Sequence, residues 1–100
     1  MEKSNTYDMK HSTNYLRFAE KFITYTIEQL IELFNREVGN NAWTSMRAAH
    51  DCALIDEFRR RNIDVSAISN GDMISFNYPV MYDETGKRLL AVVPLRKSGK

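Results

Sequence analysis

The fold is decided within residues 58–71, which read FRRRNIDVSAISNG. Before this stretch apolar residues recur every three or four positions, whereas from Ile63 onward they alternate with polar ones. The first spacing is typical of an amphipathic helix and the second of a half-buried strand. Asn62 tolerates the left-handed conformation that ends many helices, and Asn70-Gly71 is a strong hairpin signal. The stretch therefore predicts helices before it and antiparallel strands after it.

Three helices are predicted on the N-terminal side. The first runs from about Thr13 to Thr24, with Ser12 or Thr13 as its cap. The second begins at a capping box, Thr26 to Gln29, and ends at Gly39 because glycine adopts the left-handed conformation without steric cost. The third runs from a cap at Asn41 to Arg61. Its predicted inner face consists of Ala42, Trp43, Met46, Ala49, Ala53, Leu54 and Phe58.

Three strands are predicted on the C-terminal side. The first follows Ile63 up to the hairpin signal, and the last covers Lys87 to Leu95, with a turn at Asp83–Gly86 before it. The apolar run Leu89–Val93 in the last strand predicts burial on both faces. The middle strand contains Pro79, which marks an edge or a bend. One face of that strand carries Ile74, Phe76, Tyr78, Val80 and Tyr82.

We therefore expect an α+β fold: three N-terminal helices followed by a three-stranded antiparallel β-meander packed on them. A winged-helix-like arrangement of the same elements is the alternative. One hundred residues fit one domain. The expected organisation is a mobile leader at 1–11, a single domain at 12–95 and a basic tail at 96–100.

Composition limits the classes of function. Fourteen Lys and Arg against thirteen Asp and Glu give a net charge of +1, so no global field attracts nucleic acid or an anionic membrane. Cys52 is the only cysteine, which excludes an intrachain disulfide and favours a reducing compartment. The sequence has no signal-like apolar N-terminus and no apolar run near the ~20 residues that span a bilayer. We expect a cytoplasmic protein.

The sequence offers no catalytic constellation. His50 and Cys52 are two residues apart and would point in different directions on a helix, and Asp56 beside Cys52 would disfavour a thiolate. Asp51, Asp56 and Glu57 are typical of a solvated acidic face. Glycine-rich phosphate loops and four-ligand Cys/His spacings are both missing from the sequence. We therefore expect a protein that is not an enzyme and uses no cofactor or metal.

Nucleic-acid binding is an alternative. The two helices joined by Gly39-Asn40-Asn41 resemble a helix-turn-helix, with a recognition helix that starts near Trp43 and a wing at Asp83–Arg88. The acidic residues of both helices argue against DNA. On this alternative the contacts to DNA would come from Thr44, Ser45, Arg47, Arg59, Arg60, Arg61, Lys87 and Arg88.

The aromatic strand face allows a further possibility. Phe76, Tyr78 and Tyr82 would stack on RNA bases if exposed, but we expect them to cover the helices as part of the core. The favoured interpretation is a binding or regulatory module that acts by protein–protein contacts. Its exposed strand edges suit a protein partner or self-association, and we infer no membrane and no small-molecule ligand.

Overall fold

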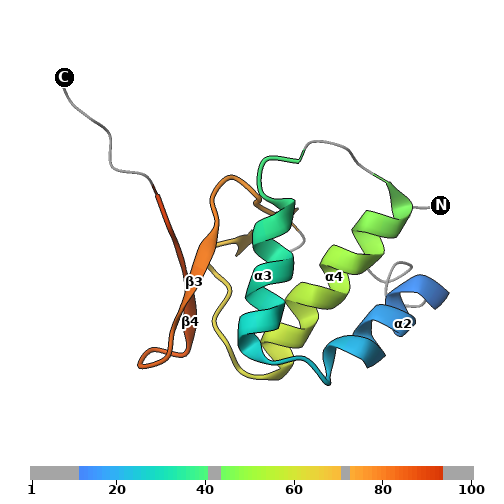
Figure 1. Cartoon of the computed structure of the whole chain (residues 1–100), viewed down its shortest axis with the longest axis horizontal. Coiled ribbons are helices and arrows are strands. Elements are labelled where there is room, and N and C mark those ends of the chain that lie inside the picture. The colour runs from blue at the N-terminus through green and yellow to red at the C-terminus, as the bar shows by residue number, and fades with distance from the viewer. Residues whose placement is uncertain (1–11, 41–43, 71–72, 94–100) are drawn as a thin grey trace.

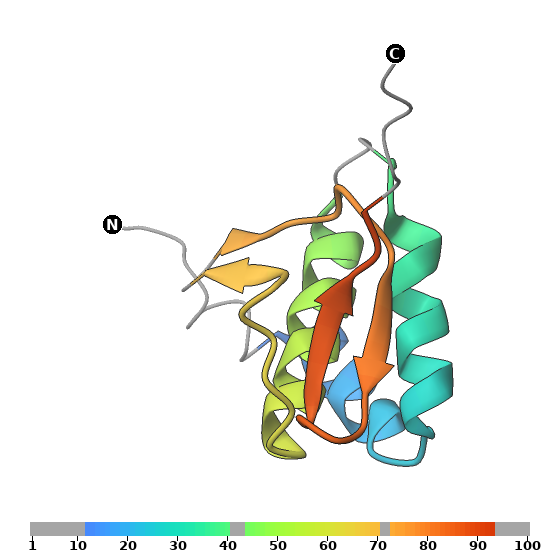
Figure 2. The same ribbon diagram turned by 90° about the vertical axis from the view of Figure 1, so that its left-hand side faces the viewer.

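A computed structural model describes residues 12–40, 44–70 and 73–93 of the chain. Three helices are followed by a two-stranded antiparallel hairpin that packs against them, which confirms the α+β class (Figures 1 and 2). A second, shorter hairpin precedes it. The elements are α2 (Thr13–Phe22), α3 (Ile27–Glu37), α4 (Ser45–Arg60), β1 (Ser69–Asn70), β2 (Met73–Ile74), β3 (Val80–Asp83) and β4 (Arg88–Ala91). Within the described ranges no helix is long and apolar enough to cross a membrane.

The predicted caps of the first two helices are confirmed. The Ser12 hydroxyl accepts from the backbone N–H of Tyr15 at the start of α2. At α3 the Thr26 hydroxyl accepts from the Gln29 N–H, and the Gln29 side chain accepts from the Thr26 N–H. Gly39 follows α3 with a φ of +83°, and its N–H donates to the Phe76 carbonyl. Both helices therefore begin through local chemistry. Helix α2 ends at Phe22, before the predicted Thr24, and the end of α3 also depends on the distant Phe76.

The predicted start of the third helix is wrong. The cap of α4 is Thr44, whose hydroxyl accepts from the Arg47 N–H, and the helix begins at Ser45. Asn41, Ala42 and Trp43 lie outside the described residues. Met46, predicted to face inward, is 51% exposed because it lies in the first turn, beyond the core. Asn62 ends the helix with a φ of 63°, as predicted.

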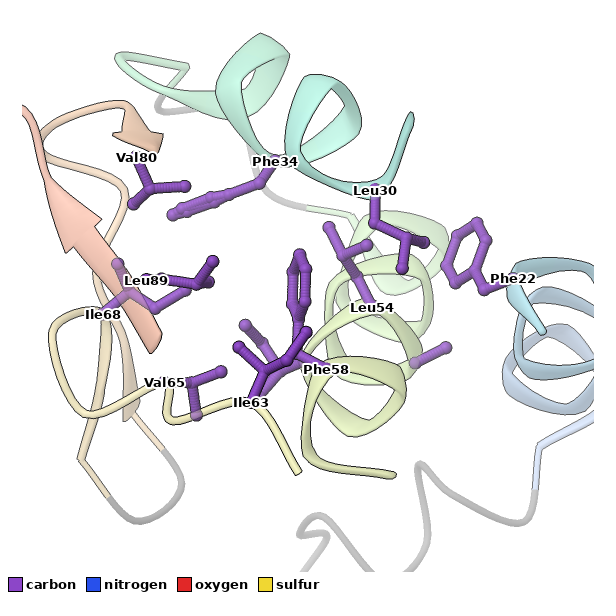
Figure 3. Close-up of a cluster of buried hydrophobic side chains, with 12 residues drawn as sticks. Phe22, Leu30, Phe34, Leu54, Phe58, Ile63, Val65, Ile68, Val80 and Leu89 are labelled. Carbon is purple, nitrogen blue, oxygen red and sulfur yellow. The ribbon is translucent and has the colours of Figure 1, made fainter. Parts of the chain in front are cut away.

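Helix α4 is the centre of the molecule. It lies between α2 and α3, and the β3–β4 hairpin packs on the same core (Figure 1). A helix covered on most sides buries residues all around its axis, polar ones included. The buried residues of α4 are Ala49, Asp51, Ala53, Leu54, Ile55, Glu57 and Phe58. Around it, Figure 3 shows Phe22 and Leu30 beside Leu54 at one side of the core and Phe34 pointing toward Val80 at the other, in a cluster that also includes Ile63, Val65, Ile68 and Leu89.

The strands do not form the predicted three-stranded meander. In the part of the chain that is described they form two separate hairpins, β1–β2 and β3–β4. Of the predicted first strand, β1 remains at its end and one parallel bridge joins Asp64 to Arg88 near its start, because the chain turns at Val65–Ile68. The predicted middle strand is broken between Ile74 and Val80. The Phe76 carbonyl there binds the end of α3, and Pro79 has no N–H to donate to a ladder.

The two hairpins differ from prediction in register and burial. Asn70 pairs with Met73 and so belongs to strand β1 rather than to the predicted Asn70-Gly71 turn, while Gly71 lies outside the described residues. In the second turn Lys87 adopts a positive φ of 51°. Only Leu89 of the run Leu89–Val93 is buried, and burial on both faces is therefore wrong. Helices cover one face of this hairpin and leave the other to solvent.

Candidate functional site

The three arginines that end α4 are engaged inside the protein. Arg60 donates to both carboxylate oxygens of Glu57 at 3.0 and 2.7 Å, and Arg61 donates to one of them at 2.6 Å. Burial raises the pKa of Glu57, but the hydrogen bonds from Arg60 and Arg61 outweigh it and hold this pKa below its usual value. Arg59 donates to the Ser69 hydroxyl at 2.9 Å and lies 3.8 Å from the Asp56 carboxylate.

Arg61 has a second set of acceptors. Its guanidinium donates to the backbone carbonyls of Phe22, Ile23 and Tyr25 at 3.0, 3.4 and 2.7 Å. These carbonyls belong to the end of α2 and the connection to α3. Arg61 therefore fastens this connection to the last turn of α4, which is a structural role.

The remaining basic candidates lie in the β3–β4 turn. Arg88 donates to Asp83 at 2.9 Å, a bond that lowers the pKa of Asp83, while Lys87 is exposed. Asp64 joins this turn to the end of α4: its N–H donates to the Lys87 carbonyl and its carbonyl accepts from the Leu89 N–H. The five basic candidates 59–61 and 87–88 therefore share one end of the molecule (Figure 2). Four of them have a carboxylate partner there.

The three other candidates lie at the opposite end of α4. Thr44 is the helix cap, and Ser45 is exposed. The Arg47 side chain is only 16% exposed. It forms ion pairs with Glu37 and with Asp51 (3.4 Å), donates to the Asn40 carbonyl at 2.8 Å and lies over the Phe76 ring. Arg47 therefore ties α4 to the end of α3.

A polar cluster surrounds Arg47. Ligand atoms of Glu37, His50 and Asp51 lie within 4.8 Å of one another, and these are the described groups with the chemistry to hold a metal ion. His50 Nδ1 is 3.0 Å from Asp51, and the imidazole packs edge-on against two phenyl rings of α2. The Arg47 guanidinium contacts both carboxylates and already supplies the cation. A metal ion would have to displace it.

The predicted solvated acidic face on α4 is wrong. Asp51 and Glu57 are 7% and 4% exposed, because each accepts hydrogen bonds or ion pairs inside the fold. Asp56 accepts from the Tyr15 hydroxyl at 2.6 Å. Burial and this bond raise the pKa of Tyr15 far above its usual value, so the phenol stays protonated and offers no base. These acids connect α4 to its neighbours.

The two outer edges of the β3–β4 hairpin differ in the groups that hydrogen-bond to them. On β3, the Asn35 carboxamide donates to the Val80 carbonyl at 3.1 Å and accepts from the Val80 N–H at 2.8 Å, as a neighbouring strand would. On β4, Asp64 occupies only the start of the strand. Sequence reasoning missed both contacts, since Asn35 reads as a surface residue of a helix 45 positions away from Val80.

The rest of the β4 edge is open. Val92 donates to the Pro79 carbonyl, so even-numbered residues of β4 direct their N–H and C=O groups to β3 and odd-numbered ones direct theirs outward. In the described ranges no group hydrogen-bonds to the N–H or C=O of Ala91, or to those of Val93. An unpaired strand edge is a template for another strand.

The uncovered face of the hairpin beside this edge is apolar. Val80 and Leu89 point to the core, so Met81 and Leu90, which are cross-strand partners, point outward. Met81 is 54% exposed and Val92 is 42% exposed. We call Met81, Leu90 and Val92 the outer stripe. The stripe lies beside the open edge at Ala91 and Val93.

The aromatic face of the predicted middle strand is not a platform. Phe76 stacks on Phe34 at 4.7 Å between ring centroids, and Tyr82 packs against the core. Tyr78 alone of the three is largely exposed. The expectation of a core role therefore fits Phe76 and Tyr82.

No family model, curated protein or solved structure matches this chain. Its function is therefore inferred from the geometry of its own residues.

Proposed function

We propose that the protein is a non-catalytic binding module that receives an extended segment of a protein along the open part of β4. The observation that carries this proposal is the Ala91 backbone, whose N–H and C=O have no partner among the described residues, with the outer stripe beside it. In strand addition, backbone hydrogen bonds provide affinity and alternate side chains provide specificity. Ala91 would supply the backbone hydrogen bonds, and Met81 and Val92 would supply the side-chain specificity.

The way the edges are protected supports this proposal. Native proteins usually block a strand edge, since an open one promotes aggregation. Here helix α3 lies along the β3 edge and its Asn35 pairs with Val80, while Asp64 pairs with the start of β4 (Figure 2). The short opening at Ala91 admits only a few residues of another chain, which suits selective binding.

DNA binding by a winged-helix-like arrangement is the second candidate. It is supported by the placement of Arg59–Arg61 beside the β3–β4 turn, where a wing would lie (Figure 2). Three features count against it. Residues 49–58 of α4, which would have to reach DNA, are mostly buried. The connection from α3 spans residues 38–44, whereas the turn of a helix-turn-helix has about three or four residues. Of the five basic residues 59–61 and 87–88, four face carboxylates.

The proposal is tested by selecting binders from a displayed library of random linear peptides. Wild-type protein should enrich extended peptides with alternating apolar residues, and their addition should shift the amide signals of Leu89–Val93. Ala91→Pro removes the edge donor and should abolish binding. Met81→Lys should weaken it, whereas Met46→Lys, at an equally exposed methionine on α4, should not.

Two outcomes would count against strand addition. Peptides that bind wild type and Ala91→Pro alike would place the binding surface elsewhere. Alternatively, mixed-sequence duplex DNA could shift the amides of Arg59–Arg61 and Lys87–Arg88, with an affinity that falls steeply as salt rises. That result, with no enriched peptide, would favour the second candidate.

A further inference from the structure

We infer that the occupant of the open edge is a second copy of this chain, paired antiparallel through β4. The two hairpins would then form one four-stranded sheet around a two-fold axis at Val92. This inference rests on the proposed function and names its partner. It is argued from the direction of the backbone groups, the chemistry of the side chains and the closure of the remaining edges.

The backbone of β4 is complementary to itself. Ala91 and Val93 both direct their N–H and C=O groups outward, with Val92 between them. In an antiparallel pair centred on Val92, Ala91 of each copy lies opposite Val93 of the other. Both are hydrogen-bonded pairs, so the two pairs use every outward donor and acceptor of these residues. Asp64 already occupies the N–H of Leu89, which limits the contact to this short segment.

The side chains fit the same arrangement. Leu89–Val93 contains no charge, so no like charges meet at the axis. Val92 would face its own copy in a non-hydrogen-bonded pair, where cross-strand side chains are closest. The two outer stripes would join across the axis into one apolar band.

The covered β3 edge explains why such an assembly would stop at two. The four-stranded sheet would have the order β3–β4–β4–β3, so each of its outer edges is a β3 strand beside helix α3, with Asn35 paired to Val80 (Figure 2). A symmetric contact through β4 leaves no uncovered edge of this hairpin for a third copy. Closure at two copies is therefore built into the protection of the hairpin.

Sedimentation of the full chain over a wide concentration range tests the inference. Wild type should convert from monomer to dimer, and Val92→Lys, which sets two like charges at the axis, should raise the dissociation constant by at least about 10-fold. Met46→Lys should sediment like wild type. Because Ala91→Pro could disturb the strand, Val92→Lys is the primary variant, and its fold is checked by its amide spectrum.

Cross-linking supplies an independent measurement. In a Cys52→Ser background, Val92→Cys should form a disulfide between copies in oxidised glutathione, because residues opposite each other in a non-hydrogen-bonded pair lie at disulfide distance. Met46→Cys in the same background should remain monomeric.

Three results would overturn the inference, and they separate it from the proposed function. If the protein stays monomeric while selected peptides still shift the amide signals of Leu89–Val93, the result supports the binding module and excludes a second copy as its partner. A dimer that Val92→Lys leaves intact, with no Val92→Cys disulfide, places self-association on another surface. A monomer that enriches no peptide refutes both.

Discussion

The two outer edges of the β3–β4 hairpin show opposite solutions to the same problem. On β3 a side chain of α3, Asn35, makes both hydrogen bonds that a neighbouring strand would make at Val80. On β4 the backbone of Asp64 does this at one end and leaves Ala91 without a partner in the described part of the chain. The difference indicates that protection of an edge can come from any correctly placed donor and acceptor. It also indicates that the gap at Ala91 is local.

The two faces of the same hairpin differ as clearly as its edges. Val80 and Leu89 are buried against the helices, while on the opposite face Met81 and Val92 are exposed and Leu90 is partly buried. Leu89 and Leu90, which are adjacent in β4, therefore have different roles. The inner one holds the hairpin on the core, and the outer one belongs to the proposed contact surface.

The largest expected effect separates these two leucines. Leu89→Ala should lower the free energy of unfolding by about 2–5 kcal/mol, because it leaves a cavity under the hairpin. Leu90→Ala should lower it by about 1 kcal/mol or less, since that side chain is already half exposed. Urea unfolding of both variants measures the difference. Equal losses of unfolding free energy would show that both faces of the hairpin contribute equally to stability.

A middle-sized effect is expected at Asn35. Asn35→Leu removes both hydrogen bonds to Val80 and should cost about 1–3 kcal/mol of unfolding free energy. Asn35→Asp keeps the acceptor for the Val80 N–H and should lose less. The opened β3 edge should also let Asn35→Leu form assemblies larger than a dimer in sedimentation. Asn14→Leu on α2 is the matched control, and larger assemblies of that variant would contradict the role of the edge.

The smallest effect is expected at Asp64. Its carboxylate accepts from the Ser66 N–H, a bond that lowers the pKa of Asp64. A lowered folded-state pKa means that this support is complete above the unfolded value of about 3.9 and is lost as pH falls through the folded-state value. Asp64→Ala should therefore lower the protection of the Leu89 amide at neutral pH, measured against the intrinsic exchange rate at the same pH, and acid should lower this protection in wild type. Asp83→Ala is the control, and an equal loss of protection in that variant would assign the effect to the turn as a whole.

The sequence predicted what local chemistry determines. The caps at Ser12 and Thr26, the helix ends at Gly39 and Asn62 and the position of the second hairpin all depend on residues within a few positions of one another. The buried set of α4 was partly predicted, because Ala49, Ala53, Leu54 and Phe58 recur at helical spacing.

Contacts between distant segments could not be predicted. The division of the expected middle strand depends on Phe76, whose carbonyl binds Gly39 and whose ring packs against α3. The acids of α4 were misplaced at the surface because their partners, Tyr15 and Arg47 among them, come from other helices or from an earlier turn. The open edge at Ala91 follows only from register, which an apolar run such as Leu89–Val93 does not specify.

Arg61 has a consequence for how the molecule comes apart. Its guanidinium bridges the last turn of α4 to carbonyls that lie 36 to 39 residues earlier in the chain. If α2 detached alone, Arg61 would lose the Phe22 carbonyl and the His50 imidazole would lose its contacts with Phe18 and Phe22. Fraying from the N-terminal helix is therefore penalised at two separate places along α4. We expect the three helices to behave as one cooperative unit in native-state hydrogen exchange, without a stepwise release of α2.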